Sequence, residues 1–162
     1  FSSFLVNMNV LFEEFLRRVL RSRVRDFIVR KGGEYYLDTL GKFRRRPDIT
    51  LKKNKCEILV VDAKYKLLSQ KDFEQGKAVD SDVNQIVSYC LAIPVKHGVL
   101  VYPKIQGAVV EERPEPVQVR EKDIKFSIKA VDLTRTTREG FMAECDNFSQ
   151  YIQKIAEATA LE

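Results

Sequence analysis

The residues of this sequence whose types and spacing could do chemistry are Asp48, Asp62 and Lys64. Asp62 and Lys64 come at the end of an apolar segment of strand length, and alternation along a strand makes their side chains project from one face. Burying either charge without a partner is costly, and a bound metal ion would supply a reason for both. A hairpin could bring Asp48 beside Asp62, which would join two of the hard oxygen ligands that Mg²⁺ prefers.

Pro47-Asp48 followed by Asp62-Ala63-Lys64 resembles the signature of the PD-(D/E)xK nucleases. The resemblance implies that the two aspartates hold Mg²⁺ or Mn²⁺, that the Ala63 carbonyl adds a ligand, and that Lys64 positions or activates the attacking water. So short a pattern also arises by chance. In that alternative, Asp48 lies in a turn after proline and Lys64 pairs with Asp62 at a solvated strand end.

Two further features support a catalytic role for this pattern. Gln85 and Tyr89 lie four residues apart on an expected helix, and the pair resembles the Gln-x-x-x-Tyr motif of RecB-type nucleases, where it steadies the lysine or contacts DNA. Glu13 lies at the margin of the apolar stripe of an N-terminal helix, whereas Glu14 faces away. The family resemblance makes Glu13 an additional metal or water ligand. The alternatives are a polar helix edge for the pair and an exposed acid for Glu13.

A cluster of basic residues adjoins the acids. Arg44, Arg45 and Arg46 precede Asp48, and together with Lys66 they could bind phosphates on either side of a cleaved bond. The net charge of +5 is compatible with double-stranded DNA as a partner but is a weak signal alone. A basic edge that discourages aggregation is the alternative.

The elements that must position these residues alternate between helical and strand patterns. Apolar residues at three- and four-residue steps predict helices, and alternation with turn residues predicts strands. On the strand around Asp62 we expect Ile58, Val60, Asp62 and Lys64 to share a face. We expect helices at 5–28, 80–93 and from about 137, strands at 35–40, 43–51, 56–62, 98–102 and 124–133, a surface loop at 66–80 and an irregular connection at 103–123.

The motifs together resemble the McrC family, the nuclease subunit of McrBC-type modification-dependent restriction systems. The resemblance extends over roughly the first two thirds of the chain, and its more specific parts are Met8-Asn9 with Phe12-Glu13, and the run Asp-Ala-Lys-Tyr-Lys from Asp62. It implies an α/β, restriction-endonuclease-like core with a mixed central sheet flanked by helices. It also implies a GTP-hydrolysing, McrB-like AAA+ motor as a partner, joined through a region before the nuclease domain. A dimer of nuclease domains is left open.

Bulk properties set the remaining expectations. The 162 residues suit one nuclease domain over 1–162, expected to be a C-terminal fragment of a longer chain. No apolar run reaches the length of a membrane span, and three widely spaced cysteines favour the cytoplasm. The leading hypothesis is a Mg²⁺-dependent DNA endonuclease. The rivals are a RecB-like exonuclease and a catalytically idle DNA-binding or scaffolding module of the same fold.

Overall fold

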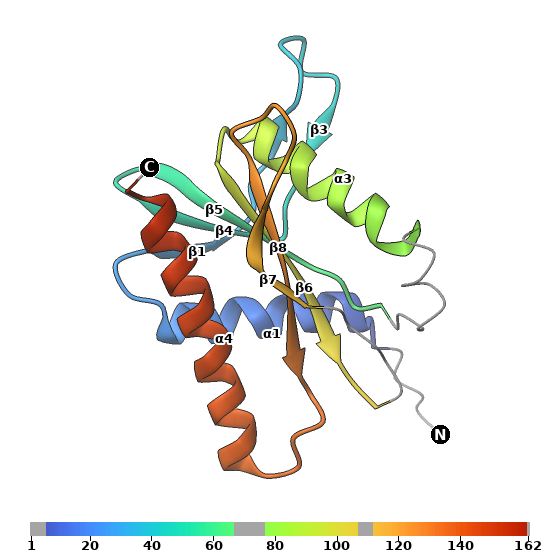
Figure 1. Cartoon of the computed structure of the whole chain (residues 1–162), viewed down its shortest axis with the longest axis vertical. Coiled ribbons are helices and arrows are strands. Elements are labelled where there is room, and N and C mark those ends of the chain that lie inside the picture. Colours follow the sequence, from blue (N-terminus) through green and yellow to red (C-terminus); the bar gives the residue numbers. More distant parts are fainter. Residues whose placement is uncertain (1–5, 67–76, 107–111, 162) are drawn as a thin grey trace.

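A mixed six-stranded sheet forms the centre of the molecule (Figure 1). The computed structural model describes residues 6–66, 77–106 and 112–161. In sheet order the strands are β1 (Ile28–Lys31), β4 (Ile49–Lys53), β5 (Cys56–Ala63), β6 (His97–Lys104), β8 (Lys125–Asp132) and β7 (Arg113–Gln118); β2 (Tyr35–Tyr36) and β3 (Arg44–Arg45) form a separate small sheet. β5 pairs in parallel with β6, and β6 with β8, whereas the outer pairs are antiparallel.

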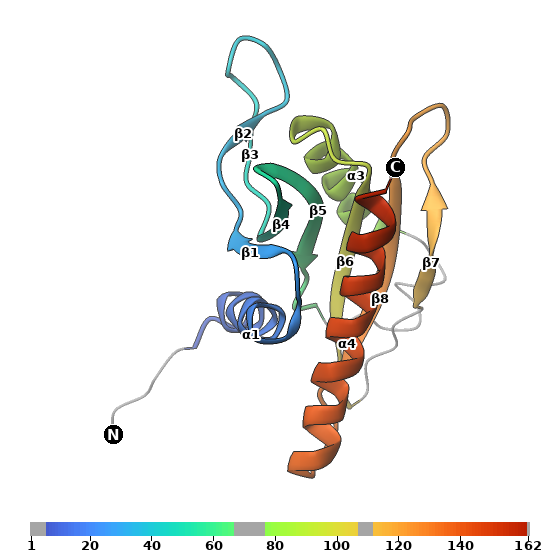
Figure 2. The ribbon, with the colours of Figure 1, turned by 90° about the vertical axis from the view of Figure 1, so that its left-hand side faces the viewer.

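Helices cover both faces of the sheet (Figures 1 and 2). α1 (Met8–Arg23) and α4 (Arg138–Thr159) bury Leu16 and Phe148 against one face, and α3 (Lys77–Ala92) buries Ile86 against the other. Both apolar clusters are closed to solvent, which gives the layered arrangement that hydrophobic faces require. This is the mixed sheet flanked by helices that we expected. In the parts of the chain that the structure describes, no helix is long and apolar enough to cross a membrane.

The strand β5 presents its side chains to both layers. Leu59 and Val61 pack under α1 and α4, whereas Val60 packs under α3. Ile58 was expected on the face of Val60, and this prediction is wrong. The register with β4 shifts between Leu51 and Lys52, and this bulge turns Ile58 toward the α1 and α4 cluster.

The first helix ends earlier than expected, because a strand follows it. Val24 already has an extended conformation, and Asp26 has a φ of 62°, a left-handed value that stops a helix. Phe27 and Val29 are buried on alternate positions, and β1 pairs with β4 with Val29 opposite Leu51. The apolar residues at the end of the expected helix therefore belong to a strand.

Proline explains a second difference. The expected strand at 43–51 is split into β3 and β4, because Pro47 has no backbone N–H to donate to a ladder. Asp48 therefore precedes β4 rather than lying within a strand. The expected strand at 35–40 is only β2.

The C-terminal half follows the expectations more closely, with two corrections. The connection at 103–123 contains the edge strand β7, where prolines are tolerated. α3 begins at Lys77, so the end of the expected loop at 66–80 is helical, and residues 67–76 lie outside the described residues. α4 begins where the sequence predicted, since the Thr137 hydroxyl caps it by accepting from the Gly140 N–H at 3.1 Å.

Candidate active site

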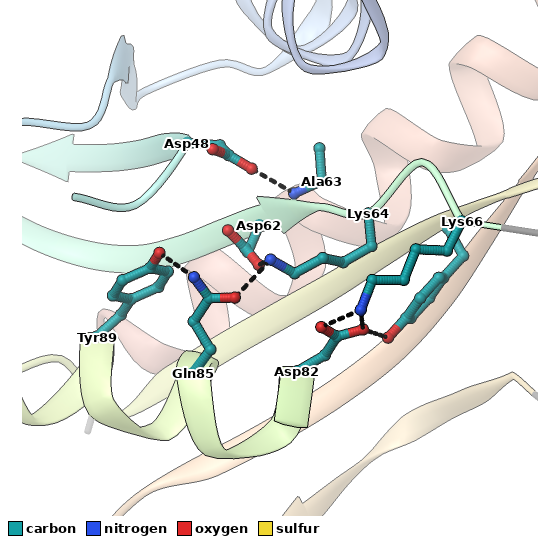
Figure 3. Close-up of polar contacts among 9 residues, drawn as sticks. Asp48, Asp62, Ala63, Lys64, Lys66, Asp82, Gln85 and Tyr89 are labelled. Atoms are coloured by element: carbon teal, nitrogen blue, oxygen red, sulfur yellow. Dashed lines mark hydrogen bonds and ion pairs between the residues drawn. The ribbon is translucent and has the colours of Figure 1, made fainter. Parts of the chain in front are cut away.

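The two aspartates meet because β4 and β5 are antiparallel neighbours. Ile49 pairs with Val61, so Asp48 and Asp62, the residues beside this pair, lie next to each other. The Asp48 Oδ2 accepts a hydrogen bond of 2.8 Å from the Ala63 N–H, which fixes the Asp48 carboxylate against the end of β5 (Figure 3). The hairpin that the sequence suggested therefore brings both carboxylates to one place.

Lys64 lies directly beyond this pair. Its Nζ is 2.6 Å from the Asp62 Oδ2 and 2.6 Å from the Gln85 Oε1, and the Gln85 Nε2 donates to the Tyr89 hydroxyl at 2.6 Å (Figure 3). A backbone bond from the Lys64 N–H to the Val101 carbonyl at 2.8 Å holds the strand end in the sheet. Gln85 thus contacts the lysine that follows the acids and is itself held by Tyr89, as the resemblance to the Gln-x-x-x-Tyr motif implied.

The electrostatics of the pair are those of two carboxylates short of positive charge. Burial, followed by the neighbouring Asp62 carboxylate, raises the pKa of Asp48 to about 7. Burial also raises the pKa of Asp62, and the Lys64 ammonium opposes this effect. Burial and the charges of both aspartates raise the pKa of Tyr89 to about 12, so its hydroxyl stays protonated. The site favours a protonated acid unless a further cation enters.

The donor set of this pair suits a hard divalent cation. The Asp62 Oδ2 is buried, and no described residue gives it a well-aligned hydrogen bond although the Lys64 ammonium is close. Such an oxygen has a lone pair free for a ligand. Within the described ranges, no group of three or more His, Cys, Asp or Glu side chains is placed to hold a metal ion. The fit is therefore to a cation held by two carboxylates, with other ligands from backbone and water.

Glu13 reaches the same cleft from α1. Its carboxylate lies 3.6 Å from the Lys31 Nζ. Burial and the charge of Asp48 raise the pKa of Glu13, whereas Lys31 lowers it. Glu14 faces away and forms ion pairs with Arg17 and Arg18, as the helical spacing predicted. The structure therefore brings Glu13 near Asp48, but not into a three-carboxylate cluster.

These residues line a cleft of about 280 Å³. A second groove of about 530 Å³ lies between α3 and the three arginines, and it shares Gln85 and Tyr89 with the cleft. Apart from those two residues, the groove is lined by Arg44, Arg45, Arg46, Ser81, Asn84 and Ser88. No acidic side chain is among these lining residues, so the groove presents hydrogen-bond donors to whatever enters it.

The predicted phosphate-binding residues differ in their surroundings. The Arg44 guanidinium lies 3.1 Å from an exposed Glu34 carboxylate, whereas the Arg45 Nε donates to the Ser88 hydroxyl at 2.5 Å. Arg46 is exposed beside them. Lys66 lies on the other side of the cleft, so the structure gathers the three arginines in one groove and separates Lys66 from them.

The sequence reasoning missed Asp82 and Tyr102. The Lys66 Nζ lies 2.7 and 2.9 Å from the two oxygens of Asp82 (Figure 3). The Tyr102 hydroxyl donates to the Asp82 Oδ2 at 2.7 Å. The signal was present in the spacing, since Asp82 lies one helical turn before Gln85 and Lys66 lies two residues after Lys64. Asp82 also lies next to apolar positions of the helix, and an acid at such a position indicates a buried carboxylate that needs a partner.

Comparison with known proteins places the chain in a family. The family model described as McrBC 5-methylcytosine restriction system component matches residues 1–103. No curated protein matches. One similar solved chain comes from a half-complex of the tetradecameric assembly of Thermococcus gammatolerans McrB AAA+ hexamers with bound McrC, with a TM-score of 0.71 at 21% identity. The match covers 95% of this chain and 34% of that one, so this chain spans about a third of its length.

These comparisons confirm two expectations drawn from the motifs. The structural likeness, at its low identity, supports the restriction-endonuclease-like α/β fold. The family match covers all the residues discussed as site candidates, from Glu13 to Tyr89, since it ends at residue 103, within β6. The chain belongs to the McrBC family of 5-methylcytosine restriction system components.

Proposed function

We propose that this chain is the nuclease module of an McrBC-type restriction system and hydrolyses DNA phosphodiester bonds with Mg²⁺ or Mn²⁺. The observation that carries the proposal is the pairing of Asp48 and Asp62 directly beside the Lys64 ammonium. The half-buried Asp48 carboxylate and the buried Asp62 carboxylate, this close together, favour a doubly charged cation, because one lysine does not fully compensate both.

The residues of the cleft divide the work. Asp48 and Asp62 would hold the cation, with the Ala63 carbonyl as a further ligand and Glu13 as a ligand of metal-bound water. A bound divalent cation supplies an activated water and neutralises charge that develops on the phosphate. The Lys64 ammonium has three N–H donors. It donates one to Gln85 and forms an ion pair with Asp62, which leaves a donor for the attacking water or a phosphate oxygen.

The groove beside α3 supports a polyanionic substrate. Arg44, Arg45 and Arg46 line it without a lining carboxylate, and it continues into the cleft through Gln85 and Tyr89. Phosphate contacts from such side chains position a duplex without reading its sequence. We assign the groove to the DNA backbone on one side of the cleaved bond.

The family match and the similar solved structure support a proposal for the protein partner. In that structure McrB AAA+ hexamers are assembled with McrC. We propose that this chain likewise acts with an McrB-like AAA+ GTPase on double-stranded DNA. Double-strand cleavage would use two nuclease domains, an arrangement that the mass of the active assembly tests.

The test is cleavage of methylated plasmid DNA by the full assembly with Mg²⁺ or Mn²⁺. Asp62→Asn is expected to lower cleavage by about 1,000-fold or more, about 4 kcal/mol of barrier. Asp146→Asn is the matched control, since Asp146 is an exposed residue of α4 that forms an ion pair with Arg23 of α1. Equal cleavage by wild type, Asp62→Asn and Asp146→Asn would remove the nuclease assignment.

A further inference from the structure

Asp82 forms a second connection between β5 and α3, parallel to the one through Lys64. Lys64 reaches Gln85 on α3, and Lys66 reaches Asp82 one turn earlier on the same helix. Lys64 and Lys66 are two residues apart on the chain, so both ammonium groups leave the end of β5 toward one helix (Figure 3). Tyr102, from the neighbouring strand β6, completes the second connection.

Burial makes Asp82 the fixed member of this group. Its side chain is 4% exposed, whereas that of Lys66 is 42% exposed. A buried carboxylate must keep its partners, and Asp82 has three bonds of 2.7 to 2.9 Å to two side chains. Lys66, in contrast, is partly exposed, and water could solvate its ammonium if the contact with Asp82 were lost. The Asp82 carboxylate therefore holds the Lys66 side chain against α3, and both of its oxygens bond the Lys66 ammonium.

The position of Asp82 gives this contact a consequence for catalysis. Gln85 lies three residues after Asp82, so any slide or tilt of this part of α3 moves the Gln85 amide relative to Lys64. The Gln85 Oε1 lies 2.6 Å from the Lys64 Nζ, so a separation by about 1 Å more would break this hydrogen bond.

We infer that Asp82 is a positioning residue: its contacts with Lys66 and Tyr102 fix α3 so that Gln85 holds Lys64 at the reacting phosphate. Lys66 then serves this connection rather than contacting a DNA phosphate. The inference rests on the proposed nuclease function and deepens it, because it assigns the geometry of the catalytic lysine to a residue that touches neither metal nor DNA.

The first test is steady-state cleavage by the full assembly with Asp82→Asn, which keeps the side-chain size and an acceptor for Tyr102. We expect kcat to fall by about 10- to 100-fold, as for other supporting partners of a metal site, with KM for DNA within about twofold. Glu112→Gln is the matched control, since Glu112 also accepts from a lysine, Lys129, and from a backbone N–H, on the far side of the sheet. Asp82→Glu should recover part of the activity.

Two results separate positioning from other roles. Adding Asp82→Asn to Gln85→Ala should lower kcat by less than about threefold further, because the contact acts through Gln85. Lys66→Met should lower kcat and leave the salt dependence of DNA binding unchanged. Full additivity with Gln85→Ala, or a KM effect of Lys66→Met with a reduced salt slope, would overturn the inference.

A readout without cleavage keeps the two proposals separable. In Asp82→Asn, the backbone amides of the first described turns of α3 and of Lys64 should exchange with solvent faster than in Glu112→Gln. Unchanged exchange contradicts the inference even if the wild-type assembly cleaves nothing. Wild-type cleavage that Asp82→Asn leaves intact contradicts it as well, whereas an inactive wild type with altered exchange counts against the nuclease assignment only.

Discussion

The two faces of the central sheet differ in what they bury. Under α1 and α4, the core cluster consists of apolar side chains such as Leu16, Val61 and Phe148. Under α3, the same sheet buries Asp62 and Asp82 within or beside its apolar cluster. One strand, β5, serves both faces, so its alternation separates residues that hold the fold together from residues placed for chemistry.

The comparison shows that the buried charged side chains Asp62 and Asp82, which cost folding free energy, lie on the same face of the sheet. Buried charges weaken a fold unless partners compensate them, and on the α3 face the compensation is incomplete at Asp62, whose Oδ2 lacks a well-aligned hydrogen bond among the described residues. The α1 and α4 face has the close-packed apolar contacts that offset such a cost. Stability and activity should therefore respond to different substitutions.

The largest expected effect separates activity from stability. Asp62→Asn should lower cleavage by about 1,000-fold or more. It should leave the metal-free protein as stable as wild type or more stable, because burial raises the pKa of Asp62 and so disfavours its charged form in the folded state. Cleavage rate and urea unfolding of the same preparation measure both. A variant that unfolds more easily than wild type would contradict the division between the faces.

The opposite result is expected on the other face. Leu16→Ala removes a fully buried side chain from α1 and should lower the free energy of unfolding by about 3 kcal/mol. Because Leu16 is not among the residues that line the cleft, the cleavage rate per folded molecule should change less than about twofold. Chemical unfolding measures the stability, and cleavage rates normalised to the amount of folded protein measure the activity. A large loss of rate in fully folded Leu16→Ala would contradict the separation of stability and activity between the two faces.

A pH dependence sharpens the comparison at Asp48. Its pKa is about 7 when folded and about 3.9 when unfolded, so between these values the folded state binds the extra proton. The metal-free protein should therefore lose stability as pH rises from about 4 to about 7, with a slope below about 1.4 kcal/mol per pH unit from this group. Asp48→Asn should remove that slope, and Mg²⁺ should stabilise wild type at pH 7.5 more than at pH 5. Melting temperatures across pH measure it; an unchanged slope in Asp48→Asn argues against the coupled pair.

The smallest expected effect lies in the basic groove. Arg45→Ala should weaken DNA binding by about 1 kcal/mol and reduce the slope of log K against log salt by about one, with kcat little changed. Arg44→Ala should have the smaller effect, since Arg44 already pairs with Glu34. Binding titrations in an Asp62→Asn background measure this without cleavage. Equal salt slopes for Arg45→Ala and its parent would place the DNA elsewhere.

The sequence predicted the elements whose patterns are long and uninterrupted. The start of α4 near Thr137 and the strand carrying Asp62 followed from their apolar patterns, and the meeting of Asp48 with Asp62 followed from a hairpin argument. β1 was missed because Val24, Phe27 and Ile28 continue the three- and four-residue apolar steps of the helix, although the helix has already ended before Asp26. The face of Ile58 was wrong because a bulge shifts the register, and no local pattern reveals a bulge.

The site residues that belong to a sequence motif could be predicted from the sequence. Gln85 and Tyr89 share a helix face as their spacing suggested, and Gln85 meets Lys64 as the resemblance to RecB-type nucleases implied. The contact of Lys66 with Asp82 depends on how α3 packs against β5 and β6, which is a property of the tertiary structure. For that reason Lys66 was expected at DNA, and its carboxylate partner was not foreseen.

The central claim is that Asp48 and Asp62 share one divalent cation beside Lys64. Anomalous diffraction from crystals of the chain soaked in Mn²⁺ tests it most directly, with Asp62→Asn crystals as the control. The account predicts one Mn²⁺ peak within bonding distance of an oxygen from each carboxylate in wild type and none in the variant. A wild-type peak bound elsewhere, or no peak from protein whose assembly cleaves DNA in Mn²⁺, would contradict it.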